Sequence, residues 1–165
     1  MHTQFGEGSA GTGTEAAYTT TVLGVRDGPV EAAWASALAA PSSGFPRIVV
    51  NVRPGMPVLP MTLMVPKLAL ADARLLLGAV QAGVAEAVVA CVADGVIDPF
   101  DAPRTLLLAA VWLDPAAVDE DLVFANQRAA ARAALRSGAG GGRPIAEVLT
   151  AASSGAWNLF FRDRS

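Results

Sequence analysis

The sequence predicts an α/β protein, because segments of strand-forming residues alternate with segments of helical periodicity. β-Branched and apolar residues, which favour strands, concentrate at residues 16–24, 48–52 and 106–113. Apolar residues recur at helical spacing at residues 30–38, 84–93 and 118–136. The chain has 165 residues, 53% of them hydrophobic and 16% charged. This length and composition predict one domain with a sizeable core.

The chain begins with residues 1–14, which are rich in glycine, serine and threonine. This composition predicts a flexible N-terminal segment, followed by a single domain over residues 15–165. The glycines at 8–13 are not followed by the lysine of a phosphate-binding loop, so this segment carries no nucleotide-binding signature. Residues 16–24 then predict a strand in which Tyr18 and Thr20 share one face, because side chains alternate along a strand.

Residues 57–67 are the most informative stretch for a binding site. Pro57, Pro60 and Pro66 remove backbone donors, which predicts an extended segment that is either an edge strand or a strand-like crossing. The segment ends at Lys67, beside an apolar wall of alternating residues. Two interpretations of this lysine remain open. It anchors an anionic or carbonyl-bearing ligand, or it reaches out to solvent from the end of the strand.

The second half of the chain predicts more helix around one buried strand. Gly78 and Gly83 predict a break near Gln81, with a helix from about Val84 to Ala93. Residues 106–113 form an apolar run typical of a strand buried on both faces. Residues 118–136 predict the longest helix. Its expected buried stripe comprises Val118, Leu122, Ala125, Ala129 and Ala133.

Arg128, Arg132 and Arg136 form a row along another face of this helix. The row is either a solvated basic face, or a surface that meets an acidic neighbouring subunit or an anionic ligand. Residues 138–142 predict a flexible connector, and residues 145–152 a short helix. The apolar tail at residues 157–161 is expected to dock on the core or on another subunit.

Composition argues against several classes of protein. The net charge of −3 argues against general nucleic-acid binding. Cys91 is the only cysteine and His2 the only histidine, so neither a disulfide framework nor a zinc cluster is expected. No signal peptide is recognisable, and Gln81 and Glu86 interrupt the longest apolar stretch. A cytoplasmic protein without a membrane span is the expectation.

Several short motifs, in their shared order and spacing, resemble the formaldehyde-activating enzyme family. The resemblance extends over roughly Gly11 to Arg136. The matching pieces are Gly-Thr-Gly-Thr-Glu-Ala-Ala at 11–17, Gly-Phe at 44–45, Pro-Xaa-Thr-Leu-Met-Xaa-Xaa-Lys at 60–67, Asp-Ala-Arg at 72–74, Gln-Xaa-Gly-Val-Ala at 81–85 and Ala-Xaa-Gly-Xaa-Ile at 93–97.

This resemblance implies a fold and an activity. The implied fold is a mixed sheet with helices packed on it in two layers, like the second domain of ribosomal protein S5. The implied activity is condensation of formaldehyde with tetrahydromethanopterin to a methylene derivative and water, without a metal or separate cofactor. The implied assembly is a homopentamer whose pterin lies in a cleft between neighbouring subunits.

The resemblance also assigns site positions, some of which are changed here. Tyr18 stands where the family has its catalytic histidine, and Thr20 stands where it has an aspartate. Lys67 and Gln81 match ligand-contact residues of the family. Val49 replaces a leucine whose backbone meets the pterin, and Ala69 replaces a threonine.

The changed residues leave three hypotheses. Loss of water from a carbinolamine needs a proton donor with a pKa near neutrality, whereas a phenol has a pKa of about 10. The chain is either an enzyme with Tyr18 as its proton donor, a binding module that holds a pterin-like ligand, or a structural partner of active subunits.

Overall fold

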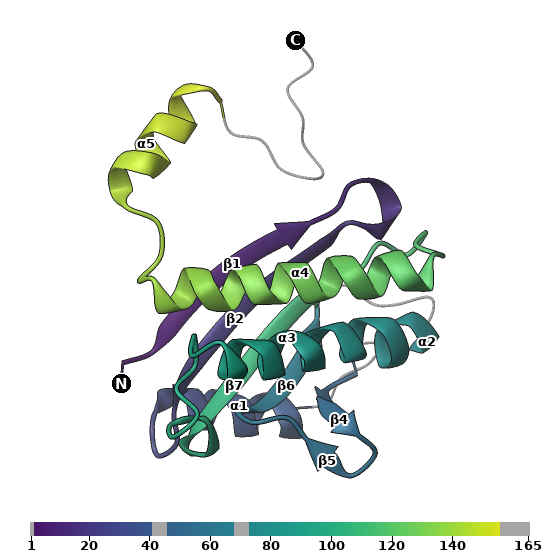
Figure 1. Cartoon of the computed structure of the whole chain (residues 1–165), viewed down its shortest axis with the longest axis vertical. Helices are drawn as coiled ribbons and strands as arrows, with labels where there is room; N and C mark the ends of the chain where they lie inside the picture. The colour runs from purple at the N-terminus through teal and green to yellow at the C-terminus, as the bar shows by residue number, and fades with distance from the viewer. Residues whose placement is uncertain (1, 41–45, 68–72, 156–165) are drawn as a thin grey trace.

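The computed structural model of the chain describes residues 2–40, 46–67 and 73–155. Its centre is a five-stranded sheet in the order β1-β2-β7-β6-β3 (Figure 1). Only the β6–β7 pair is parallel, and the other neighbours are antiparallel. The strands are β1 (Gln4–Ala10), β2 (Ala17–Val25), β3 (Ile48–Val49), β6 (Met61–Pro66) and β7 (Thr105–Trp112). A separate hairpin pairs β4 (Asn51–Arg53) with β5 (Met56–Pro57).

Helices cover both faces of the sheet unequally. Helices α3 (Gln81–Ala93) and α4 (Glu120–Ala139) lie side by side over one face (Figure 1). Helix α1 (Pro29–Ala39) packs against the end of β2 on the opposite face, where Val30 meets Gly24. The mixed sheet with packed helices confirms the predicted α/β class. The likeness to ribosomal protein S5 stays a prediction.

The prediction of a flexible segment at residues 1–14 is wrong for residues 4–10. These residues form β1, which pairs with β2 along its whole length. Gly6 and Gly8 face α4 so closely that an added Cβ would lie 1.9 Å from the carbonyl oxygen of Ala134 and 2.3 Å from that of Ala130, respectively. Glycine at these two positions therefore allows α4 to pack closely against β1. The domain begins earlier than predicted.

The stretch before Lys67 is not at the edge of the sheet. Strand β6 lies between β7 and β3. Its prolines are tolerated because Pro60 precedes the strand and Pro66 is its last residue. The short strand β3 pairs only with Leu63 and Met64, so this pairing does not need the backbone N–H that Pro66 lacks.

The expected break near Gln81 is replaced by a continuous helix. Helix α2 (Ala73–Leu75), a π-helical turn (Leu76–Val80) and α3 follow one another with helical backbone angles. By length and composition alone, Ala73–Ala93 is apolar enough to cross a membrane, but 56% of its most apolar window is buried inside the protein. A core helix meets the same criterion, and many of its residues belong to the hydrophobic core.

The predicted buried stripe of α4 is also wrong. Val118 precedes the helix and is 80% exposed, and Leu122 is 49% exposed. The residues that face the sheet and α3 are Val123, Gln127, Ala130, Ala131, Ala134, Leu135 and Gly138. Alanine occurs all round this helix, so apolar spacing did not distinguish its faces. One polar contact does: Gln127 Nε2 donates to Thr19 Oγ1 over 2.6 Å in the core.

The chain leaves the sheet after α4. Helix α4 continues to Ala139, further than predicted, and α5 (Ile145–Ser153) follows as expected. Helix α5 lies away from the sheet (Figure 1), and all its residues are exposed. The tail at residues 157–161, for which docking was predicted, lies outside the described residues.

Candidate active site

Four side chains from three strands meet on the sheet face opposite α3 and α4. Thr19 and Thr21 of β2 are buried, so Tyr18 and Thr20 point to the other face and are half-buried. Glu7 of β1 pairs with Thr20, and Lys67 directly follows β6. Lys67 Nζ donates to Thr20 Oγ1 over 2.7 Å. The Tyr18 hydroxyl donates to Glu7 Oε2 over 2.9 Å. We refer to Glu7, Tyr18, Thr20 and Lys67 as the sheet-face cluster.

The backbone fixes where the lysine enters this cluster. The N–H of Lys67 donates to the carbonyl of Val111 over 2.8 Å, which extends the β6–β7 ladder by one residue. The Lys67 ammonium then lies 4.4 Å from the centre of the Tyr18 ring, within the range of a cation–π contact. The lysine is therefore held by Thr20 and Tyr18 instead of simply reaching out to solvent.

The cluster shifts two pKa values in opposite directions. Loss of hydration at its position lowers the pKa of Lys67 below 10.5, although Glu7 opposes this change by its charge. The pKa of Tyr18 is raised above 10.0, first by loss of hydration and then by the hydrogen bond and charge of Glu7. The phenol is thus a weaker acid than usual, and the ammonium is a stronger one.

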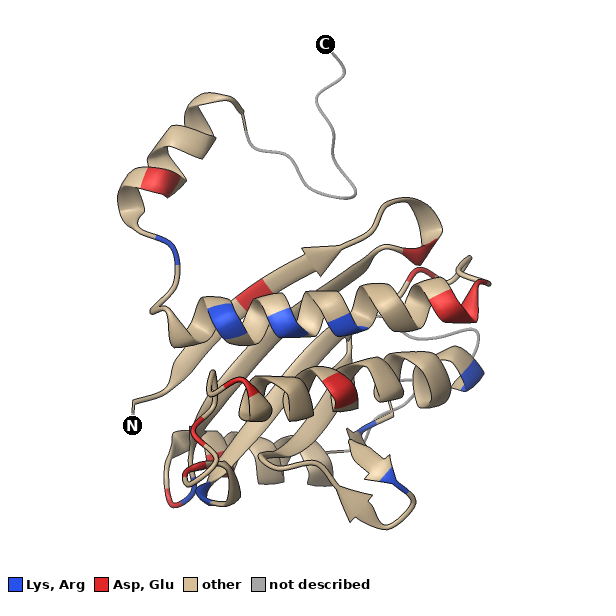
Figure 2. Cartoon of the chain, viewed as in Figure 1, with Lys and Arg blue, Asp and Glu red and all other residues tan. Residues whose placement is uncertain are grey.

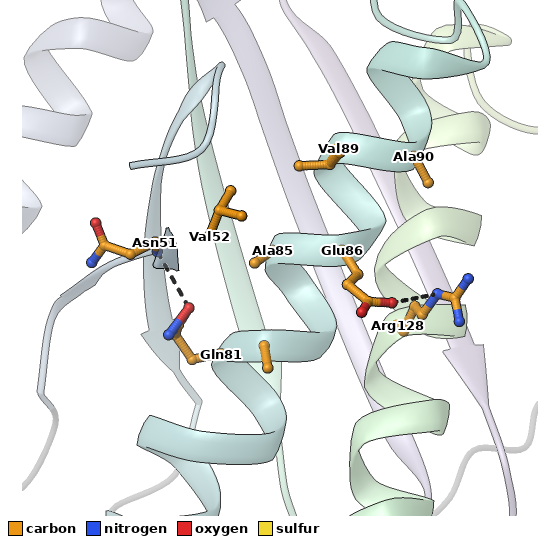
Figure 3. A pocket seen from close by; sticks show the side chains of 9 residues that line it. Asn51, Val52, Gln81, Ala85, Glu86, Val89, Ala90 and Arg128 are labelled. Atoms are coloured by element: carbon orange, nitrogen blue, oxygen red, sulfur yellow. Dashed lines mark hydrogen bonds and ion pairs between the residues drawn. The ribbon is translucent and has the colours of Figure 1, made fainter. Parts of the chain in front are cut away.

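Gln81 lies in a different place from the sheet-face cluster. Its Oε1 accepts from the backbone N–H of Asn51 over 3.2 Å, and Asn51 Nδ2 donates to the Val49 carbonyl over 2.9 Å. Figure 3 shows Gln81 and Asn51 at one side of a pocket of about 420 Å³ between β4 and α3. The lining residues are Asn51, Val52, Gln81, Ala82, Ala85, Glu86, Val89, Ala90 and Arg128.

The predicted site residues therefore fall into two groups within one chain. Tyr18, Thr20 and Lys67 come together on the open sheet face. Gln81 lies apart from them, on the side where α3 packs, and is linked through Asn51 to the backbone carbonyl of Val49. Val49 itself pairs with Leu63, which the register places on the same face as Tyr18 and Thr20. Ala69 lies outside the described residues.

The arginine row of α4 is engaged by the neighbouring helix. Arg128 Nε lies 3.3 Å from Glu86 Oε2 of α3. Arg132 and Arg136 both pair with Asp94, which follows α3. Figure 2 shows the basic positions as blue segments along the ribbon of α4. Each arginine of the row therefore has an acidic partner within the chain, while its side chain stays partly exposed.

Sequence reasoning missed Glu7 and Asn51. The signal for Glu7 was Gly6-Glu-Gly8, in which glycines at every second position are typical of a strand packed closely against another element. Asn51 carried no comparable signal. Cys91 is buried, and burial raises the pKa of its thiol, so it is a poor nucleophile. Among the described residues, no group of three or more His, Cys, Asp or Glu side chains is placed to hold a metal ion.

Fold and site together define a small α/β protein with a lysine, a phenol and a carboxylate gathered on an open sheet face. The chain matches the family model described as "Formaldehyde-activating enzyme (Fae)" over residues 5–160. It is 33% identical over 163 residues to a 5,6,7,8-tetrahydromethanopterin hydro-lyase of Methanosarcina barkeri, which covers 97% of this chain and 91% of the relative. The chain therefore belongs to the formaldehyde-activating enzyme family.

Longer relatives contain a similar region. A bifunctional enzyme Fae/Hps of Methanosphaerula palustris is 30% identical over 156 residues, which is 93% of this chain and 40% of the relative. One from Methanoculleus marisnigri is 33% identical over 134 residues, which is 79% of this chain and 34% of the relative. The chain thus spans less than half the length of these bifunctional relatives.

Proposed function

We propose that this chain condenses formaldehyde, or a related small aldehyde, with a reduced pterin of the tetrahydromethanopterin type. Family membership supports the reaction class. The observation that carries the proposal is the sheet-face cluster, because it holds Lys67 against Tyr18 and Thr20 on an open surface. A cation fixed in this way can bind a carbonyl oxygen or an anionic ligand group.

The reaction defines what these residues have to do. A pterin nitrogen adds to the aldehyde carbon and gives a carbinolamine. Its hydroxyl then leaves as water once it is protonated, and a second nitrogen closes the ring. The Lys67 ammonium, with its lowered pKa, is better suited to give up a proton than an ordinary lysine. Tyr18 then serves as a hydrogen-bond donor and as an aromatic support for the ammonium.

The two groups of predicted site residues favour a site shared between subunits. We propose a homopentamer in which the sheet-face cluster of one subunit faces Gln81 and the backbone at Val49 of its neighbour. Within one chain Gln81 lies on the α3 side of the sheet and the sheet-face cluster on the other side, which favours a pterin held between two subunits. The assembly would act in the cytoplasm without a metal or a separate cofactor.

A second function is favoured by one specific observation. The raised pKa of Tyr18 makes the residue at the family's histidine position a poor proton donor. A protein that holds a pterin without transforming it, as a carrier or sensor, would be consistent with this change.

Calorimetric titration with tetrahydromethanopterin and with tetrahydrofolate, followed by a condensation assay with formaldehyde, separates these functions. The first proposal predicts binding of a reduced pterin and a formaldehyde-dependent rate above the spontaneous condensation. Binding without an increase in rate would favour the carrier. If the protein neither binds a reduced pterin nor increases the rate, the structural-partner hypothesis remains.

A further inference from the structure

Lys67 is the only lysine in the chain, and all other basic side chains apart from His2 are arginine. Lys67 therefore supplies the only lysine amine that can react with an aldehyde, because the guanidinium groups of the arginines stay protonated. The amine is held at a defined place, by Thr20 Oγ1 at 2.7 Å and by the Tyr18 ring at 4.4 Å. A lysine with these neighbours is positioned for chemistry as well as for charge.

We propose that Lys67 is a covalent capture site for a small aldehyde, which it holds as an iminium ion before a second amine accepts the carbon. This inference rests on the proposed function, and it changes the role of Lys67 from an electrostatic anchor to a nucleophile. The ligand class is an unhindered aldehyde, with formaldehyde as the smallest member.

The capture step is balanced without an oxidant or reductant. The neutral amine adds its lone pair to the aldehyde carbon, the carbonyl electron pair moves to oxygen, and a proton passes from nitrogen to that oxygen. The nitrogen lone pair then forms the C=N bond as the C–O bond breaks, and the hydroxyl leaves as water with one added proton. Overall, the lysine ammonium and formaldehyde give a methylene iminium ion and water.

The surroundings of the amine act on this step in two ways, because loss of hydration favours the neutral amine whereas the charge of Glu7 partly opposes that effect. Loss of hydration lowers the pKa of Lys67, which increases the fraction of neutral nucleophile at neutral pH. Thr20 and Tyr18 of β2 contact the amine, Glu7 of β1 acts on it by charge, and its own backbone is fixed to β7 at Val111. The Glu7 carboxylate also favours the positive charge of the iminium product.

Reductive trapping tests the proposal with formaldehyde alone. We would treat the protein at neutral pH with ¹³C-formaldehyde and cyanoborohydride, which donates hydride to the iminium and leaves N-methyl-lysine. Arg26→Lys supplies a matched reference, because Arg26 is exposed in the turn after β2 and the variant carries both lysines in one molecule. Peptide mass spectrometry then compares the two labelling rates.

We expect Lys67 to be labelled at least about tenfold faster than the lysine at position 26. This is a small part of the roughly 10²–10⁴-fold that positioned proton transfer commonly gives. The advantage should be lost in Thr20→Val, with folding checked by circular dichroism. Equal or slower labelling of Lys67 would overturn the proposal, and so would an advantage that survives unchanged in Thr20→Val.

Lys67→Arg separates this inference from the proposed function. The substitution keeps the positive charge but removes the nucleophile, so we expect pterin binding to remain and condensation to fall at least about tenfold. If the wild type and Lys67→Arg catalyse condensation at equal rates, covalent capture is contradicted and the proposed function is left intact. A wild-type protein that is labelled selectively but does not condense would contradict the function and leave the capture site intact.

Discussion

The pKa shifts of Lys67 and Tyr18 divide the chemistry of the site between two residues. Loss of hydration disfavours the charged form of Lys67, so its ammonium gives up a proton more readily and its neutral amine is more available as a nucleophile. The phenol is disfavoured as an acid because loss of hydration, and then the hydrogen bond and charge of Glu7, raise its pKa. A better acid at position 18 should therefore increase the condensation rate, and the size of the increase measures the effect of the weakly acidic phenol.

The variant Tyr18→His/Thr20→Asp makes this test. The imidazole titrates near neutrality, and the adjacent carboxylate favours its protonated form and so raises its pKa above about 6.5. We expect condensation to rise at least about tenfold, within reach of general acid catalysis. Because the protonated imidazole is the acid, the added rate should fall as the pH rises through that pKa. A flat pH profile with no gain would exclude position 18 from proton transfer.

Part of this cluster was predictable from the sequence and part was not. Strand alternation correctly placed Tyr18 and Thr20 on one face. The edge position predicted for the proline-rich stretch was wrong, and the stretch did not reveal that Lys67 meets Tyr18 and Thr20. Glu7 was missed because a glycine-rich segment has the composition of a flexible tail. Only its packing against α4 makes that segment a strand.

The contact between β1 and α4 is the element-scale feature on which the site depends. Gly6 and Gly8 bring the strand against the helix, and alternation then turns Glu7 toward Tyr18 on the other face. A side chain at either glycine would meet helix backbone, which cannot move aside cheaply.

Gly8→Ala should therefore destabilise the fold by about 1–3 kcal/mol, the usual cost of overpacking. Urea denaturation monitored by circular dichroism measures the change in the free energy of unfolding. Gly78→Ala is the matched control, because its Cβ would lie 3.6 Å from a Glu120 side-chain oxygen, an ordinary contact, within a helical segment. The control should be neutral or stabilising by up to about 1 kcal/mol. Equal effects in both variants would contradict the proposed β1–α4 packing.

The buried bond between Gln127 and Thr19 fixes α4 to β2 and is open to a double-mutant cycle. Either Gln127→Leu or Thr19→Val leaves one buried polar group without its partner, at a cost of about 1–3 kcal/mol. The double variant removes both polar groups and should cost less than the sum of the two single changes. Strict additivity in the unfolding free energies would show that the two side chains are not coupled.

The same helix shows why its buried face was mispredicted. Apolar periodicity works where polar residues mark the outer face, but α4 has alanine on every side and a buried glutamine. Gln127 points inward to Thr19, while Arg128 pairs with Glu86 of α3 and Arg132 and Arg136 pair with Asp94, which follows α3. These are tertiary contacts, which the local sequence pattern does not contain.

At the scale of the whole molecule, exposed apolar side chains favour an assembly. Ile145 of α5 is 70% exposed and Leu149 is 64% exposed, and neither packs on the sheet. For the proposed pentamer we expect a mass of five times 16.8 kDa, about 84 kDa, by light scattering at micromolar concentration. A monomeric mass at that concentration would contradict a site shared between subunits.

The most direct test of the sheet-face cluster is the condensation rate of Lys67→Ala relative to the wild type. Lys67 follows a strand and is exposed, so we expect the free energy of unfolding to change little. The rate of pterin condensation with formaldehyde should fall at least about 10²-fold, because the change removes both a charge-assisted contact and the reacting amine. A variant that folds normally and condenses as fast as the wild type would contradict the assignment of the reaction to this face.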